Sequence, residues 1–409
     1  MTAADNTRIA TLASNRAIHR AFSWLHLHEP RIRRWQLEAI AIPAPPFAES
    51  ARAAWFLEQF TTLGLTNPHL DAEGNALAEL PSTTPPSEPW ALNPGPSPVI
   101  LLSAHLDTVF PPATNCTPRE EESKILAPGA CDNAAGLAAL LALGAALRHA
   151  EITPACTILF AANVGEEGEG DLRGMKHLFN PEKSPYANRI KAAIAFEGSG
   201  NETIVDRALG SRRLRVTVTG PGGHSWADAG RPNPILALSA ALLAISRIPL
   251  PRNPRTTLNV GIISGGTSVN SIPPSATADL DLRSTSAGQL DRLELAILKT
   301  LQSTIETESL HLHVKRIGDR QPGTLAESSQ LFRSLRAVDR HLRLGTDSRI
   351  GSTDANLPLS LGIPALAIGA GGTGGGMHTL EEWYDPTGRD LALRRTLLLL
   401  LDTCAQANE

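Results

Sequence analysis

The chain has 409 residues, and at about 100 to 200 residues per domain this length favours two or three domains over one small binding module. Its 37 Lys and Arg residues against 41 Asp and Glu residues give a formal charge of −4, which argues against a general nucleic-acid binder. The composition, 42% hydrophobic and 19% charged, is that of a globular protein. Four cysteines without CxxC spacing exclude a disulfide scaffold and a thiolate zinc knot.

The N-terminal segment does not read as a targeting signal. Charged and polar residues such as Asp5, Arg8 and Arg16 interrupt it, so it lacks the apolar core of a signal peptide. The longest apolar stretch, 134–147, is shorter than the ~20 residues that cross a bilayer and predicts a buried helix. We therefore expect a cytoplasmic protein with neither a membrane nor a nucleic acid as partner.

Several short runs rich in Val, Ile, Leu and Ala predict the central strands of an α/β sheet, because strands buried on both faces read as continuous apolar runs. They alternate with helical stretches and comprise residues 99–104, 156–162, 192–196 and 365–368.

Potential metal ligands follow each of these runs. His105 and Asp107 come after the first, Glu166 and Glu167 after the second, and Glu197 after the third. His378 follows the fourth run after a glycine-rich loop, and Asp132 precedes the apolar helix. In open α/β sheets ligands bind outside the carboxyl ends of the strands, so these side chains are expected to converge.

Each of these residues has a structural alternative when taken singly: Asp132 could cap its helix, and a Glu pair is usually a solvated surface. Taken together, two His and several carboxylates without Cys predict a divalent metal site, zinc first, with cobalt or manganese as substitutes. The charges of Asp132, Glu167 and Glu197 together with a bridging hydroxide would nearly neutralise the four positive charges of two Zn²⁺ ions, which favours two ions over one. Asp107 can orient His105 from two residues away, and one of the adjacent glutamates can act as general base.

From about residue 211 the pattern changes to the alternation of half-solvated antiparallel strands, at 214–219, 256–260, 277–283 and 311–315. Helical segments at 234–248 and 288–301 lie between them. This β-α-β-β-α-β order predicts an inserted α+β domain of ferredoxin-like layout. We expect a discontinuous catalytic domain, residues 1–208 and 320–409, around an insert at 209–319.

The motifs in their order resemble the M20 metallopeptidases, a family of dizinc amidohydrolases. They are His105-x-Asp107, Gly129-x-x-Asp132-Asn133, Glu166-Glu167-Gly168, Glu197-Gly198 and the distant His378. The family includes tripeptidase T, bacterial glutamate carboxypeptidase, succinyl-diaminopimelate desuccinylase, acetylornithine deacetylase and aminoacylase. The resemblance implies a mixed sheet flanked by helices, of the zinc-exopeptidase type, and covers nearly the whole chain.

Carried over by position, the resemblance makes Asp132 the ligand that bridges two metals. His105 and Glu197 complete one metal site, Glu167 and His378 complete the other, and Glu166 activates the bridging water as general base. The resemblance also implies a cis peptide bond after Asp132. It departs from the common pattern at Asn133, where many members have Asp, and at Ala134, where many have Lys; neither change removes a ligand.

In such families the insert is a lid or dimerisation domain, which implies a homodimer. By position His224 would stabilise the oxyanion in the partner subunit's site, while Asn270 and Arg283 would bind substrate. The alternative is that Gly-Gly-His is a surface turn and Arg283 an ordinary strand residue. Residues 351–356 and the glycines from 371 to 376 are expected to enclose substrate, and Cys131 to be a small buried filler.

The resulting prediction is a metal-dependent exopeptidase, a di- or tripeptidase, acting on small peptides. An N-acyl-amino-acid deacylase is the alternative within the family, because Glu197 resembles the desuccinylase and deacetylase branch. Two readings from other classes are weaker. A non-catalytic binding protein would require lost ligands, and a two-metal phosphoesterase would be favoured by Arg and Lys near the metals, which the motif segments lack.

Overall fold

The computed structural model describes residues 2–82, 97–305 and 309–407. The chain divides into two compact units, one comprising Met1–Arg207 with Thr324–Glu409 and the other Ala208–Gly323. The second boundary lies a few residues beyond the expected 319/320. The reason is that strand β14 (His311–Arg320) keeps its pairing with β9 (Gly210–Thr219) as far as Arg320, which lies opposite Ser211.

A large mixed sheet forms the centre of the first unit, which confirms the predicted fold class. Neighbours β6, β3, β7 and β17 are parallel, whereas β1, β2 and β8 pair antiparallel to theirs. In spatial order the strands are β1 (Thr66–Leu70), β2 (Ala76–Leu80), β6 (Thr157–Asn163), β3 (Val99–His105), β7 (Ile190–Phe196), β17 (Ala365–Ile368), β8 (Thr203–Ala208) and β15 (Gly323–Thr324), with β16 (Asp347–Gly351) also on β8.

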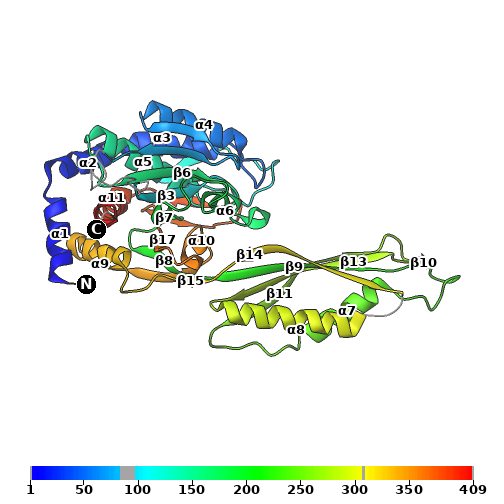
Figure 1. Ribbon diagram of the computed structural model, residues 1–409. Coiled ribbons are helices and arrows are strands. Elements are labelled where there is room, and N and C mark those ends of the chain that lie inside the picture. Colours follow the sequence, from blue (N-terminus) through cyan, green and yellow to red (C-terminus); the bar gives the residue numbers. More distant parts are fainter. Residues whose placement is uncertain (1, 83–96, 306–308, 408–409) are drawn as a thin grey trace. The chain divides into compact units, whose positions relative to one another are not determined.

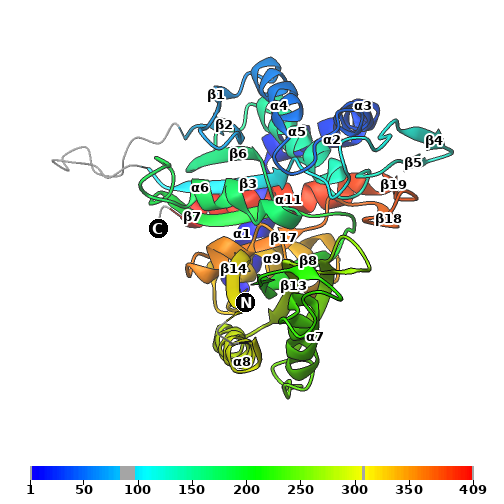
Figure 2. The same ribbon diagram turned by 90° about the vertical axis from the view of Figure 1, so that its right-hand side faces the viewer.

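Helices flank this sheet, and α5 packs on β3, β6 and β7 (Figures 1 and 2). Helix α11 contacts β3 and also packs against α2, α5 and α9. The helices are α1 (Ala3–Ala13), α2 (Arg16–Leu27), α3 (Glu29–Ile40), α4 (Ser50–Thr62), α5 (Ala134–His149), α6 (Arg173–Leu178), α9 (Gln330–Leu342), α10 (Asn356–Ser360) and α11 (Arg389–Gln406), with a 3₁₀ turn at Gly168–Gly170.

The apolar helix α5 is buried from Ala134 to Leu147, as its composition predicts. Its first turn approaches the end of β7 closely at Gly136. A Cβ added there would lie 2.9 Å from the Cβ of Phe196 and closer still to the side chain of Asn133. Only glycine fits at this point. This close approach brings the start of α5 beside the end of β7, the strand that Glu197 directly follows.

A smaller antiparallel sheet joins two loops of the first unit that are far apart in sequence. It consists of β18 (Thr373–Gly375), β19 (Trp383–Asp385), β5 (Lys124–Leu126) and β4 (Arg119–Glu121). Trp383 pairs with Leu126, and the N–H of Ala127 donates to the carbonyl of Glu382. This ladder holds the loop that carries His378 beside the loop that carries Asp132.

The second unit has an antiparallel sheet in the order β11 (Thr256–Gly265), β13 (Ser275–Ser284), β9, β14. Helices α7 (Pro234–Ile245) and α8 (Ala287–Ile305) pack side by side against it (Figure 1). Leu214, Val216 and Leu280 are among the buried side chains of the shared core. The element order and strand order are those of the ferredoxin-like layout that the sequence predicts. A short ladder, β10 (Gly223–His224) with β12 (Ser271–Ile272), adjoins it.

Among the described residues, no helix combines the length and the apolar character needed to span a bilayer.

Candidate active site

Parallel strands place the first candidate ligands at one edge of the sheet. His105 is the last residue of β3 and lies opposite Asn163, the last residue of β6. Glu197 directly follows β7, and its N–H donates to the carbonyl of Ile368 at the end of β17. Because these strands run in the same direction and end together, side chains remote in sequence meet at one place.

The structure brings the five predicted ligands into two groups that share Asp132. In each group the ligand atoms lie within 4.8 Å of one another. His105 Nε2 lies 3.1 Å from Asp132 Oδ1 and 3.9 Å from a Glu197 carboxylate oxygen. His378 Nε2 lies 3.0 Å from Asp132 Oδ2 and 3.1 Å from a Glu167 carboxylate oxygen. Asp132 therefore presents one oxygen to each group.

The protonation behaviour of this cluster shows that it favours positive charge. Hydrogen bonds to Asp132 and Glu167 raise the pKa of His378 to about 10. Burial disfavours a charged ring at His105, but the neighbouring carboxylates outweigh it and raise its pKa as well. Burial raises the pKa of Glu197 to about 7. Bound cations would be attracted by the same carboxylates that favour protons on the two histidines.

Unsatisfied buried atoms support a fit to metal ions. Within the described part of the chain, His105 Nε2, Asp132 Oδ1 and Glu197 Oε2 are buried and have no hydrogen-bond partner. Leaving such atoms without partners costs free energy, and a shared cation would satisfy all three. Imidazole and carboxylate donors without a thiolate suit zinc, cobalt or manganese.

Asp107 orients its neighbours through several bonds. Its carboxylate accepts hydrogen bonds from the backbone N–H groups of Glu166 (2.9 Å) and Glu167 (2.7 Å). His105 Nδ1 lies 3.0 Å from the Asp107 carbonyl and 3.6 Å from its carboxylate. Asp107 thus orients the imidazole of His105 and also holds the turn that carries the two glutamates. The sequence predicts only the first of these two roles.

Glu166 and Glu167 occupy different environments. Glu167 belongs to one of the ligand groups, whereas Glu166 belongs to neither. Glu166 is 4% exposed and sits on the same turn, one residue away. That Glu167 binds metal while Glu166 transfers the proton stays a prediction.

The turn that carries Asp132 depends on Glu382, a residue to which the sequence analysis gave no role. The Glu382 carboxylate accepts hydrogen bonds from the N–H groups of Gly129, Cys131 and Asp132, at 2.8 to 2.9 Å. The peptide bond between Asp132 and Asn133 is cis, as predicted. Asn133 is the N-cap of α5 but makes no side-chain capping bond, and its amide donates instead to the carbonyl of Phe196.

Replacing Glu382 with alanine is expected to lower the free energy of unfolding by about 2 to 4 kcal/mol, because three buried N–H groups lose their acceptor. Glu381→Ala, at the exposed neighbouring position, should change it by less than about 0.5 kcal/mol. Urea unfolding followed by circular dichroism measures both variants. Equal midpoints for the two would contradict this role of Glu382.

Three further buried side chains lie close to the candidate ligands in the structure or in the sequence. Burial raises the pKa of the Cys131 thiol to about 12, so it is no thiolate nucleophile at neutral pH, consistent with a buried filler. Buried Arg52 donates to the carbonyl of Leu106, between His105 and Asp107. Asp354 is fully buried and accepts a hydrogen bond from Asn163. Its carboxylate therefore contacts the end of β6, and the enclosure of substrate by residues 351–356 stays a prediction.

In the second unit, His224 and Asn270 lie together. His224 pairs with Ser271 on the β10–β12 ladder, and the N–H of Ser225 donates to the Asn270 carbonyl. The Nδ1 atom of His224 accepts hydrogen bonds from the N–H groups of Trp226 (3.2 Å) and Ala227 (3.3 Å). An accepting Nδ1 places the proton of the neutral ring on Nε2, so Nε2 is the hydrogen-bond donor.

The structure does not bring Arg283 beside His224 and Asn270. Ser275 is the first residue of β13 and the end of that strand nearest to Asn270 in sequence. Arg283 lies eight residues farther along the strand, which is roughly 27 Å at the rise of a strand. Its Nε donates to Asp281 at 2.7 Å. A substrate-binding role for Arg283 stays a prediction.

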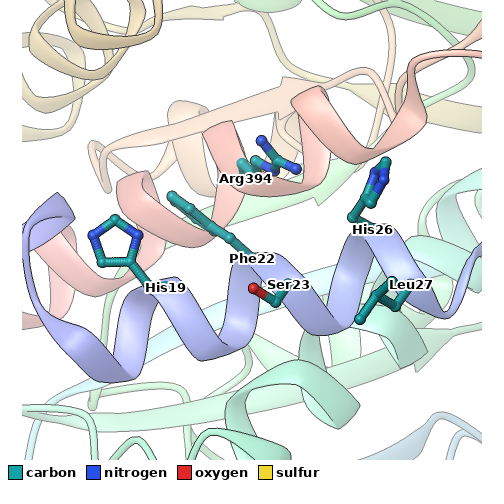
Figure 3. A pocket seen from close by; sticks show the side chains of 6 residues that line it. All are labelled: His19, Phe22, Ser23, His26, Leu27 and Arg394. Atoms are coloured by element: carbon teal, nitrogen blue, oxygen red, sulfur yellow. The ribbon is translucent and has the colours of Figure 1, made fainter.

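A separate surface hollow of about 350 Å³ lies between α2 and α11. Figure 3 shows His19 and His26 at opposite ends of it, with Phe22 between them. His26 Nδ1 pairs with Asp390 at 3.3 Å, and the Arg394 guanidinium lies over the Phe22 ring. The two imidazoles are too far apart along one helix to share an ion, so the metal-binding arrangement belongs to the sheet edge.

Comparison with known proteins adds a family match to this geometry. The model of peptidase family M20/M25/M40 matches residues 101–401. A probable carboxypeptidase of Aspergillus clavatus is 32% identical over 214 residues, 47% of this chain and 46% of that protein. One of Paracoccidioides brasiliensis is 30% identical over 213 residues, 47% of each. The alignments thus span about half the length of these curated relatives.

Solved structures share the fold over nearly the whole chain. A tripeptidase from Staphylococcus aureus superposes with a TM-score of 0.72 at 22% identity, covering 92% of this chain and 99% of its own. Human carnosine dipeptidase 1 gives 0.70 at 15%, covering 95% and 100%. A dinuclear metal-binding peptidase of Bacillus subtilis gives 0.65 at 13%, covering 92% and 98%.

Proposed function

The chain belongs to peptidase family M20/M25/M40, and on this premise we propose that it is a dizinc exopeptidase that hydrolyses amide bonds in small peptides. The observation that carries the proposal is the sharing of Asp132 between two ligand groups, with Glu166 beside them and in neither. The names of the relatives, carboxypeptidase, tripeptidase and dipeptidase, support peptides as the substrate class.

His105, Asp132 and Glu197 would hold one ion, and Asp132, Glu167 and His378 the other. When bound, two such cations lower the pKa of water and polarise a carbonyl group. Glu166 takes the proton from the attacking water and returns it to the leaving nitrogen. Asp107 keeps Glu166 in place through the backbone N–H of that residue.

In this proposal His224 stabilises the negative charge that develops on the oxyanion. Because its Nδ1 already accepts two backbone hydrogen bonds, its Nε2–H is oriented as a donor before substrate arrives. A preorganised donor of this kind stabilises the tetrahedral oxyanion without the cost of reorientation. The proposal assigns this role to His224 in the site of a partner subunit, with Asn270 beside it as a substrate contact.

Exposed apolar residues on the second unit support a homodimer. Along β11, Ile262 and Ile263 are 59% and 58% exposed, and on α7 Leu236 and Leu243 are 67% and 57% exposed. In the strand order of that sheet β11 is at the edge. An apolar edge strand next to an apolar helix is suited to pairing with a second copy of the chain.

Replacing Ile262 with lysine is expected to weaken this dimer by about 3 kcal/mol, more than a hundredfold in its dissociation constant, because the charge would be buried without a partner. Leu295→Lys, at a 53% exposed position on α8, serves as the matched control and should leave the dimer intact. Sedimentation velocity distinguishes the species. A dimer of unchanged stability in Ile262→Lys would contradict the assignment of this surface.

Removal of metal is expected to lower the unfolding temperature of the first unit by about 5 °C or more, because ligand binding to the native state alone stabilises it. Without cations, the Asp132 carboxylate lies within 4.8 Å of Glu197 in one group and of Glu167 in the other, with no bound ion to offset their charges. Calorimetry before and after chelation measures the change, and zinc should restore the original transition. An identical transition in both states would argue against the site.

A cytoplasmic location remains part of the proposal. The four cysteines are buried and form no disulfide, which is usual in a reducing compartment.

The function is tested by a substrate screen on zinc- and cobalt-loaded protein, with dipeptides, tripeptides, N-acyl amino acids and phosphoesters in parallel. Hydrolysis of short peptides is the expected outcome. Preferential cleavage of the acyl amino acids would favour the deacylase alternative, and turnover of the phosphoesters alone would overturn the amidase assignment.

A further inference from the structure

One peptide group in the turn before Asp132 is held at both ends. It joins Ala130 to Cys131, and its N–H donates to the Glu382 carboxylate at 2.8 Å. Its carbonyl accepts a hydrogen bond from the side-chain amide of Gln36, also at 2.8 Å. Gln36 lies on α3 and is fully buried. The turn that carries Asp132 is therefore held from α3 as well as by Glu382.

A second buried residue, Arg389, decides which way the Gln36 amide faces. Arg389 is the first residue of α11, and its Nη2 atom donates to Gln36 Oε1 at 2.7 Å. A guanidinium can only donate hydrogen bonds, and the carbonyl of Ala130 can only accept them. The amide oxygen must therefore face Arg389, and the amide nitrogen must face Ala130. A carboxylate at this position could serve the guanidinium alone, and an ammonium group the carbonyl alone.

The surroundings of Arg389 favour its bond to Gln36. The Arg389 side chain is fully buried, and in the described part of the chain its Nε and Nη1 atoms have no hydrogen-bond partner. The guanidinium lies over the Tyr384 ring, 5.1 Å from the ring centre. A Glu29 carboxylate oxygen lies 3.5 Å from Nη2 and supplies an opposite charge. Because burying a guanidinium costs free energy unless it is paired, the amide oxygen of Gln36 is held firmly.

We propose that Gln36 and Arg389 are positioning residues for the shared carboxylate of Asp132. Arg389 orients the amide of Gln36, and this amide holds the peptide group on which the position of Asp132 depends. Because Asp132 belongs to both ligand groups, loosening the turn weakens both metal positions together. The inference rests on the dimetal site of the proposed function, but it concerns how tightly the chain binds metal and not which bond it cleaves.

Gln36→Glu tests the inference, because glutamate keeps the acceptor for Arg389 and loses the donor for the Ala130 carbonyl. We expect zinc affinity to fall by about tenfold or more at both positions, since outer partners of metal ligands typically contribute about 10- to 100-fold. Competition with a chromophoric chelator measures the affinities. The visible absorption spectrum of the cobalt-loaded protein should also shift, because it reports the geometry of the ligands.

Gln59→Glu is the matched control, since it makes the same chemical change on the nearby helix α4. The side-chain oxygen of Gln59 accepts a hydrogen bond from the Trp35 indole at 3.2 Å, and glutamate keeps this acceptor. The zinc affinities and the cobalt spectrum of this variant should match those of the wild type.

Two substitutions at Arg389 test the orienting role. Arg389→Met removes the donor that fixes the Gln36 amide, so both zinc affinities should fall by about tenfold. Arg389→Lys keeps a cationic donor for the amide oxygen and should restore most of the loss. Both variants lose the guanidinium over Tyr384, so a packing role alone predicts that they behave alike. If Gln36→Glu does not fold, this pair carries the test.

The outcomes separate this inference from the function on which it rests. If peptides are cleaved but the Gln36 and Arg389 variants bind both ions as tightly as the wild type, the positioning role is refuted and the exopeptidase stands. A lower unfolding midpoint with unchanged zinc affinity, or a loss at one metal position only, also refutes it. If zinc affinity depends on Gln36 but no peptide is cleaved, the positioning role stands and the proposed activity fails. If the wild type binds no zinc, both are refuted.

Discussion

Glu166→Gln is expected to keep its full metal content and to lose turnover by about 10³-fold. General acid–base groups contribute roughly 10² to 10⁴ in rate, and glutamine can neither accept nor return a proton. The metal content should persist because Glu166 belongs to neither ligand group, and the hydrogen bond from its backbone N–H to Asp107 is kept in the variant. Elemental analysis and kcat, measured on the same preparation, provide both numbers.

Glu167→Gln is the matched control for this prediction, because it makes the same chemical change one residue away. Glu167 is a member of the second ligand group, so its amide variant should lose metal affinity as well as activity. Turnover close to wild type in Glu166→Gln, or equal metal loss in both variants, would exclude Glu166 as the base.

Asp132→Asn is expected to lose both metals and all measurable activity. Asp132 gives one carboxylate oxygen to each ligand group, and an amide supplies only one neutral acceptor oxygen in place of two charged ones. Outer partners of metal ligands alone alter affinity by about 10- to 100-fold, so the loss of a shared ligand should exceed 100-fold at both positions. Equilibrium competition with a chromophoric chelator measures the affinities.

Single-group variants make this prediction specific. His105→Ala removes a ligand from the first group only, and His378→Ala from the second only. Each should retain about one ion per chain, whereas Asp132→Asn should retain neither. If Asp132→Asn loses a single ion, the bridging arrangement is wrong.

The strand ends were predictable because they leave a local pattern. A buried parallel strand is a short apolar run, and a His or carboxylate directly after it stands out against that run, as at His105 and Glu197. Because parallel strands end at the same side of the sheet, the residues that follow them lie close together. The insert was predictable for a similar reason, since its strands alternate with a period of two.

Residues that act through backbone bonds left no such pattern. Glu382 resembles any polar residue before a short strand, and nothing in the sequence shows that its carboxylate accepts three N–H groups from a turn some 250 positions away. The distance of Arg283 from His224 and Asn270 likewise depends on the length of β13 and on where its tip lies.

The most direct test of the dimetal account is a titration of metal-free protein with zinc, in which peptide hydrolysis is followed against the number of zinc equivalents per chain. The shared carboxylate of Asp132 predicts that activity rises to a plateau at two equivalents. A plateau at one equivalent, or no hydrolysis at any zinc concentration, would contradict the account.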